Sequence, residues 1–135
     1  MTDKPTALPL DQTIAGALGM EFLGVSDGVA TGRIPVTHRI RQPLGLVHGG
    51  AMVTLAESLA SGGTWEGVRH DGNAAMGQEI SASLMRPITE GHVNGTARVR
   101  KRGRSAWIWD VEITDDEGNI CALVRATIAV RPARP

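Results

Sequence analysis

The feature that most limits the fold of this chain is a single helical segment, residues 49–68, placed among strand-like segments. It is rich in glycine, alanine and leucine and has no run of β-branched residues, which predicts one helix of about five turns. Strand-like runs precede it at residues 21–25 and 29–36, and further runs follow it from residue 74 onward. One helix among successive antiparallel strands predicts an α+β fold in which the sheet wraps around a largely buried helix.

The length of the chain indicates how many domains it forms. Its 135 residues leave room for one hydrophobic core and not for two. We therefore expect a single domain over residues 11–135, preceded by a flexible segment, residues 1–10. At the start of the domain, Asp11 is predicted to cap a short helix that ends at Leu18.

Aromatic residues are scarce, at 3% of the chain, so the core must be largely aliphatic. Trp107 and Trp109 lie two apart on one face of a predicted strand, and we expect them in the core. Lining a ligand pocket is the alternative for this pair. Small core side chains leave limited burial per chain, which favours an oligomer.

Several classes of protein are excluded by charge and motif. The formal net charge is zero, so no overall field attracts nucleic acid or an anionic membrane. Cys121 is the only cysteine and is expected to be a buried thiol, and the first ten residues lack the apolar core of a signal peptide, so the cytoplasm is expected. The four histidines show no metal-ligand spacing, and neither a serine-nucleophile elbow nor a phosphate-binding loop is present. We expect no metal and no cofactor.

Glu57 is the conspicuous residue of the helical segment. It is the only charged residue between Gly49 and Trp65, and Thr54 and Ser61 lie on the same helix face. A carboxylate in an apolar helix loses hydration unless it is paired, and such groups concentrate at functional sites. A structural glutamate, held by a salt bridge or exposed on a narrow outer stripe, is the alternative.

The loop before the helix supplies polar groups of another kind. Gln42, His48, Gly49 and Gly50 lead directly into the helix N-terminus, where free backbone N–H groups favour negative charge. The two glycines let a ligand approach the backbone closely. His48 taken alone is more typical of a capping or core residue than of a catalytic one. A carboxylate, an amide donor and a polar loop together are what acyl transfer requires.

These residues belong to a stretch that resembles a known family, the hotdog-fold acyl-CoA thioesterases that use a glutamate. That branch includes 4-hydroxybenzoyl-CoA and 1,4-dihydroxy-2-naphthoyl-CoA thioesterases, whereas the related phenylacetyl-CoA thioesterases carry an aspartate at this position. The resemblance spans nearly everything after residue 12 and is carried by the following motifs: QPLGLVHGGAMVTLAESLAS at 42–61, GQ at 77–78, RP at 86–87, EGHV at 90–93, WIWDV at 107–111 and IAVRP at 128–132.

The resemblance implies a role for each residue of the site. Glu57 matches the catalytic carboxylate, acting as nucleophile or as general base on water. Gly49 matches the residue whose N–H polarises the thioester carbonyl, Gln42 and His48 match loop residues that orient the substrate, and Ser61 matches a hydroxyl that helps to place the water. The loop and the glutamate of one site come from two subunits in this family. A homodimer that assembles into a homotetramer, with sites at subunit interfaces, is therefore implied.

One position departs from the family pattern. Leu84 stands where the naphthoyl-CoA branch often carries a histidine, which weakens the expectation of a naphthoyl substrate. The hydrolytic residues are not affected.

A basic cluster near residue 100 has three interpretations. Charge runs usually form a solvated strand end and turn. Nucleic-acid binding lacks support, because neither interleaved aromatic residues nor net positive charge accompanies the cluster. The family resemblance implies that Arg86 and this turn bind the CoA nucleotide and its phosphates, and the residues selected for that role are Arg86, Arg102, Gly103, Arg104 and Ser105.

The sequence thus predicts an acyl-CoA thioesterase with Glu57 as its catalytic group. An acyl-CoA-binding hotdog module without catalytic activity is the alternative, although a lone carboxylate in its helix would then be superfluous. A hydratase of the same fold would need an Asp–His pair, which this stretch does not contain.

Overall fold

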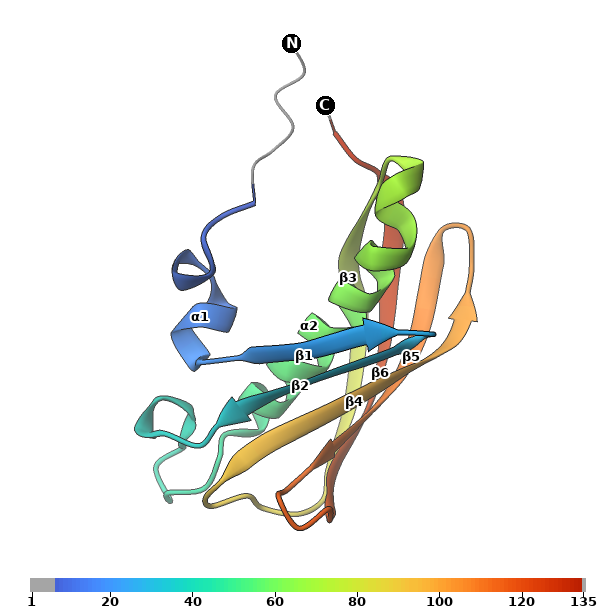
Figure 1. Cartoon of the computed structure of the whole chain (residues 1–135). Coiled ribbons are helices and arrows are strands. Elements are labelled where there is room, and N and C mark those ends of the chain that lie inside the picture. Colours follow the sequence, from blue (N-terminus) through green and yellow to red (C-terminus); the bar gives the residue numbers. More distant parts are fainter. Residues whose placement is uncertain (1–6, 135) are drawn as a thin grey trace.

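A computed structural model describes residues 7–134 of the chain. Its strands form one antiparallel sheet that curls around a long helix (Figure 1). The helices are α1 (Ile14–Leu18) and α2 (Gly49–Val68), and single 3-10 turns lie at Leu10–Gln12, His38–Ile40 and Arg69–Asp71. The strands are β1 (Glu21–Ser26), β2 (Val29–Pro35), β3 (Asn73–Leu84), β4 (His92–Arg102), β5 (Ala106–Thr114) and β6 (Ile120–Pro132). The predicted α+β layout, with a sheet wrapped around one helix, is confirmed.

The order of strands across the sheet is β1-β2-β4-β5-β6-β3. β3 therefore pairs with the last strand of the chain, from Asn73 opposite Pro132 to Leu84 opposite Ala122, and forms an edge of the sheet. The alternation pattern of the sequence did not indicate that β3 pairs with the last strand. As a result, one side of the backbone of β3, which runs beside α2, has no strand partner within residues 7–134.

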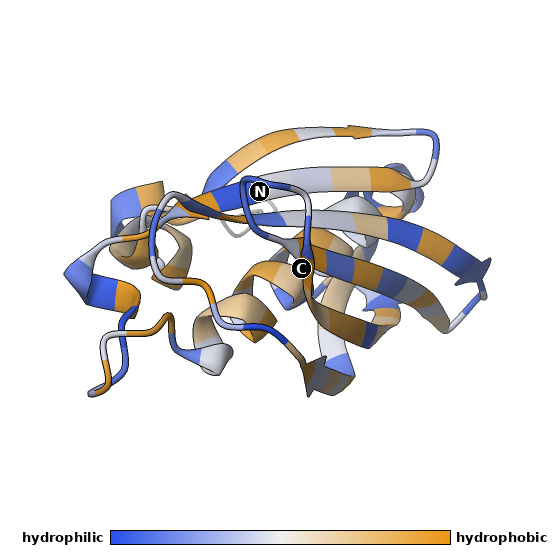
Figure 2. Cartoon of the chain, turned by 90° about the horizontal axis from the view of Figure 1, so that it is seen from below, coloured by the Kyte–Doolittle hydropathy of each residue, from blue (hydrophilic) through white to orange (hydrophobic). Residues whose placement is uncertain are grey.

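The sheet can close around α2 because two strands present glycine to it. Leu55 and Leu59 are completely or almost completely buried, at 0% and 1% exposure. A Cβ at Gly95 of β4 would lie 2.7 Å from Leu59 Cδ1, and one at Gly32 of β2 would lie 2.9 Å from Leu59 Cδ2. These two glycines let the helix side chains reach the strand backbone, which sets the close packing of helix on sheet. Figure 2 shows the alternation of hydrophobic and hydrophilic residues along the strands that face this core.

The two tryptophans of β5 pack on the second half of α2, as predicted for the core. Trp109 is fully buried, and a Cβ at Gly63 would lie 2.5 Å from its ring. The indole N–H of Trp109 donates to Thr64 Oγ1 at 2.9 Å, so the polar edge of the ring is satisfied. Trp107 lies next to it, with ring centroids 6.2 Å apart.

The first helix differs in one respect from expectation. Its N-cap is Thr13, whose side chain accepts from Gly16 N–H, and not Asp11, which lies in the preceding 3-10 turn. The predicted end is correct, because Gly19 closes the helix in the left-handed conformation with φ 73°. The expected flexible segment, residues 1–10, includes residues 1–6, which lie outside the described residues.

The predicted burial of Cys121 is confirmed, at 0% exposure. Burial raises the pKa of this thiol, which keeps it protonated and unreactive. Over residues 7–134, no helix is both long and apolar enough to cross a membrane.

Candidate active site

Glu57 lies in the middle of α2, on the side of the helix that faces β3. Its side chain is half-buried, and its carboxylate lies directly over Gly77 of that strand. Across residues 7–134, no ion pair or hydrogen bond holds this carboxylate. The salt-bridged structural glutamate considered above is therefore absent from this part of the chain, and the group is available to an incoming molecule.

The first turn of α2 presents an amide donor. His48 is the N-cap residue, and its Nδ1 accepts from the Gly50 N–H at 2.8 Å. The neutral ring therefore carries its proton on Nε2, on an exposed side chain that can donate to a ligand. The N–H of Gly49 has no hydrogen-bond partner within residues 7–134, as the first amides of a helix often do not. His48 thus caps the helix and leaves the Gly49 N–H free.

The loop that leads to this turn is braced by a residue that sequence reasoning missed. The Arg41 guanidinium donates to the Gly45 carbonyl at 2.7 Å and to the Thr89 carbonyl at 2.8 Å. Within the loop, the side-chain oxygen of Gln42 accepts from the Leu44 N–H. The side-chain NH2 of Gln42 remains the group that can contact a substrate. An arginine beside a Pro-Gly loop was the only signal in the sequence that could have identified the brace.

These residues form two groups that do not meet within one chain. Gln42, His48 and Gly49 lie at the start of α2, whereas Glu57 and Ser61 lie two and three turns further along it. With 1.5 Å of rise per residue, Gly49 and Glu57 are about 12 Å apart along the helix axis. An amide at that distance cannot polarise a carbonyl that the carboxylate attacks, so one chain alone does not complete the predicted site.

An apolar cleft of about 230 Å³ adjoins the start of the helix. Its walls include Leu46, Met52, Leu84 and Met85, and Arg86 is the only charged residue among 7–134 that lines it. The Leu84 side chain covers the Cα of Gly49, where a Cβ would lie 3.5 Å from Leu84 Cγ. The cleft therefore places apolar surface beside a free amide donor, an arrangement suited to the apolar part of an acyl group.

The residues predicted to bind CoA lie at opposite ends of the sheet. Arg86 follows β3, and its backbone N–H donates to the Cys121 carbonyl at the start of β6. The turn that contains Arg102 to Ser105 lies at the other end of β6, where the Ser105 carbonyl accepts from Val130 N–H at 2.9 Å. One chain does not bring these two parts together.

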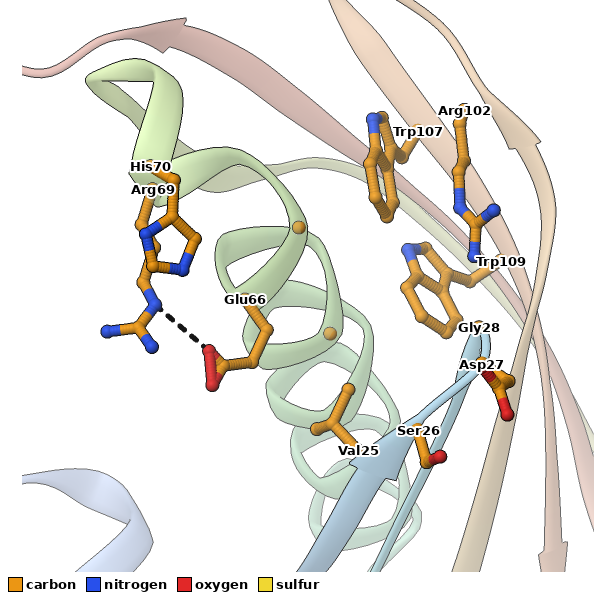
Figure 3. Close-up of a pocket in the computed structure, with 12 residues that line it drawn as sticks. Val25, Ser26, Asp27, Gly28, Glu66, Arg69, His70, Arg102, Trp107 and Trp109 are labelled. Atoms are coloured by element: carbon orange, nitrogen blue, oxygen red, sulfur yellow. Dashed lines mark ion pairs between the residues drawn. The ribbon is translucent and has the colours of Figure 1, made fainter.

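A larger cavity, of about 410 Å³, lies at the C-terminal end of α2, beside the two tryptophans for which lining a pocket was the alternative to core packing (Figure 3). Trp107 and Trp109 line it together with Arg102, whose guanidinium lies 5.4 Å from the centre of the Trp107 ring. Glu66 and Arg69 of the last helical turns form an ion pair at 3.0 Å on its opposite side. Neither Glu57 nor the start of the helix reaches this cavity, so it is separate from the candidate site.

Comparison with known proteins establishes the family. The sequence profile described as the thioesterase superfamily matches residues 44–122, which is more than half of the chain and includes Gly49 and Glu57. The chain belongs to the thioesterase superfamily. It is therefore a thioester hydrolase with the hotdog fold, as the sequence predicted.

Similar proteins and structures agree with this membership. The proofreading thioesterase EntH of Cronobacter turicensis is 37% identical over 87% of this chain and 85% of its own length. The solved structure of a variant of thioesterase PA1618 from Pseudomonas aeruginosa has 35% sequence identity and a TM-score of 0.87, covering 91% of this chain and 88% of that one. A solved variant of thioesterase SAV0944 from Staphylococcus aureus has 28% identity and a TM-score of 0.85, covering 88% and 98% of the two chains. This superfamily member therefore shares its fold with thioesterases along nearly their whole length.

Proposed function

We propose that this superfamily member hydrolyses acyl-CoA thioesters to a free acid and CoA, in a single domain over residues 11–135, with Glu57 as the catalytic carboxylate. The observation that carries this proposal is the Glu57 side chain itself. It is the only charge in the first sixteen residues of α2, it is half-buried, and no group within residues 7–134 pairs with it. A carboxylate without a partner in such a position costs free energy, and proteins keep groups of this kind mainly at functional sites.

The active unit in this proposal is a homodimer. Because about 12 Å of helix separates Glu57 from the Gly49 amide, the two must come from different chains. β3 is suited to hold such a dimer, since its outer edge has no strand partner in the described part of the chain. Met76, Leu84 and Met85 expose apolar side chains on this strand and just beyond it. A two-fold axis at this edge would set the two α2 helices antiparallel, with the start of one beside the middle of the other. Two dimers then pair into a homotetramer, as in the family that the sequence resembles.

The reaction needs few groups. The thioester carbonyl oxygen accepts a hydrogen bond from the Gly49 N–H of one subunit, at the positive end of the helix dipole. Glu57 of the other subunit attacks the carbonyl carbon and forms an anhydride, which a water later hydrolyses to the free acid and the carboxylate. Alternatively, Glu57 removes a proton from a water that Ser61 helps to hold, and this water attacks the carbonyl carbon. The C–S bond then breaks and CoA leaves as the thiolate. One such oxyanion donor stabilises the transition state by about 3–4 kcal/mol. His48 Nε2 and the Gln42 amide orient the thioester.

The same two-fold arrangement unites the proposed CoA site. Antiparallel pairing of β3 brings the Arg86 end of one subunit to the end of the other that holds Arg102, Gly103, Arg104 and Ser105. Arginine pairs with phosphate by two parallel hydrogen bonds, which suits the nucleotide of CoA. Replacing Arg104 with alanine should raise KM for CoA thioesters and leave KM for an N-acetylcysteamine thioester, which lacks the nucleotide, unchanged.

The acyl group belongs to the aroyl or medium-chain class. Support comes from the apolar cleft beside Gly49, which contains Leu84. The naphthoyl-CoA branch of the family that the sequence resembles often has histidine at this position. Two solved variants of the Staphylococcus aureus relative support the polar residues, because they carry alanine in place of one glutamine and one glutamate. Those two positions are fifteen residues apart, as are Gln42 and Glu57.

The deciding experiment follows CoA release with a thiol reagent across a panel of aroyl- and fatty acyl-CoA substrates. Glu57→Gln and Glu57→Ala are measured beside the unaltered protein, with circular dichroism as the check on folding. Turnover should fall by two or more orders of magnitude in both variants, since the group that attacks or activates water is lost; this is on the order of the loss found for essential catalytic groups. Near-normal turnover in a folded Glu57→Ala protein would refute the role of Glu57. Binding of acyl-CoA without turnover of any substrate would instead indicate a binding module.

A further inference from the structure

The Glu57 carboxylate occupies the space that a side chain at position 77 of β3 would need. A Cβ built on Gly77 would overlap Glu57 Oε1 and would lie 3.0 Å from Cδ and 3.4 Å from Cγ. Every residue other than glycine at position 77 therefore displaces the carboxylate or the strand. Oε1 and Cδ belong to the carboxylate, so the contact is with the group that the proposed reaction uses.

The backbone of Gly77 does not itself require glycine. Its φ is not among the positive values of the chain, and it pairs with Ile128 of β6 as an ordinary strand residue. Glycine in a strand interior weakens the strand and marks a close approach by another group. At this position the approaching group is Glu57.

The strand is also irregular immediately after this glycine. The pairing of β3 with β6 steps from Gly77 opposite Ile128 to Glu79 opposite Thr127, so Gln78 is an inserted residue in a β-bulge. Bulges bend a strand locally and recur beside active sites, where they redirect side chains. A bulge and a bare Cα thus coincide at the point where α2 faces β3.

We infer that Gly77 is a positioning residue, whose bare Cα and following bulge form a backbone seat for the Glu57 carboxylate. The inference rests on the proposed function of Glu57 and adds the device that orients it. No hydrogen bond or ion pair within residues 7–134 fixes the Glu57 side chain, so steric contact with β3 is the restraint that this part of the chain provides. A methyl group at position 77 would move the carboxylate away from the strand and out of line with the thioester carbonyl.

The kinetic test compares Gly77→Ala with Gly62→Ala. The control makes the same chemical change on α2, at a position where the nearest atom to the new Cβ is Phe22 Cε1 at 3.9 Å. Gly77→Ala should lower kcat by about ten- to a hundredfold, the scale of a misplacement of about 1 Å, and should leave KM within about twofold. Gly62→Ala should leave both unchanged. In a Glu57→Asp background the shorter side chain makes room, so adding Gly77→Ala should change kcat by less than about threefold, a small fraction of the misplacement loss.

A thermal-unfolding cycle tests the seat without relying on activity. Gly77→Ala should lower Tm only modestly in the unaltered protein, because the end of the Glu57 side chain can move aside, and should leave Tm unchanged or raise it when Glu57→Ala is also present. An equal loss of Tm in both backgrounds, or an unchanged kcat in Gly77→Ala, would overturn the inference. If Glu57→Ala retains turnover while the cycle still shows this coupling, the proposed function of Glu57 fails and the seat stands.

Discussion

The clearest test of the core is the replacement of Thr64 by valine. Thr64 is fully buried in α2, and its hydroxyl accepts from the Trp109 indole N–H at 2.9 Å while donating to the Ala60 carbonyl at 2.8 Å. Valine has nearly the same shape but neither donates nor accepts. The substitution therefore leaves the indole N–H of a completely buried tryptophan without a partner.

The magnitude follows from that one group. A buried donor that loses its only partner costs about 1–3 kcal/mol, and the retained volume adds no cavity cost. The Ala60 carbonyl keeps its helical hydrogen bond, so nothing else of comparable size is lost. For a domain of this length, about 2 kcal/mol corresponds to a fall in Tm of about 6–10 °C.

The chain provides a matched control for this change. Thr54 lies in the same helix and donates to the Gly50 carbonyl at 2.8 Å, but no indole donates to it. Thr54→Val should therefore change the free energy of unfolding by less than about 0.5 kcal/mol, the usual range for substitutions that break no buried network. Urea unfolding at one fixed protein concentration, followed by circular dichroism, measures both variants. Equal losses in Thr64→Val and Thr54→Val would refute the reasoning, as would a loss in Thr64→Val that persists undiminished when Trp109→Phe has already removed the donor.

Three further predictions concern other parts of the fold. Gly63→Ala should destabilise the protein by about 1–3 kcal/mol in urea unfolding, because its methyl group meets the Trp109 ring, whereas Gly62→Ala should stabilise it by up to about 1 kcal/mol; the same sign for both would contradict the packing. Arg41→Ala should lower kcat/KM by about tenfold by releasing the loop before α2, while unfolding free energy changes little, and unaltered kinetics would exclude the brace. Hydrogen bonds from the side chains of Asn94 and then His92 lower the pKa of Asp116 below 3.8. The contribution of this carboxylate to stability is therefore present above that value and is lost as the pH falls through the lowered pKa. Asp116→Asn should flatten the dependence of the urea midpoint on pH between about pH 5 and pH 2, and an unchanged slope would contradict this.

Much of the candidate site was predictable because it lies on one continuous segment. The start of α2 at Gly49, its end at Val68 and the isolation of Glu57 along it are local properties of composition and spacing. Local signals also predicted the end of α1 at Leu18. They failed for its N-cap, because Asp11 and Thr13 are both good capping residues and the choice depends on where the chain enters the first strand.

The relations between segments could not be read in the same way. Sequence alternation identified β3 as a strand but not as an edge beside α2, since pairing partners are selected by packing over long separations in the chain. The contact between Gly77 and Glu57 depends on that placement, as does the brace from Arg41 to Thr89.

By itself, then, the sequence determined which residues carry charge, which segments are helix or strand, and the family to which the chain belongs. Only the tertiary structure decided that Glu57 faces Gly77 of β3, and that Arg86 and the Arg102 turn lie at opposite ends of the sheet. The physical reason is that patterning depends on neighbours along the chain, whereas the distance between two functional groups depends on rigid elements that hold them apart.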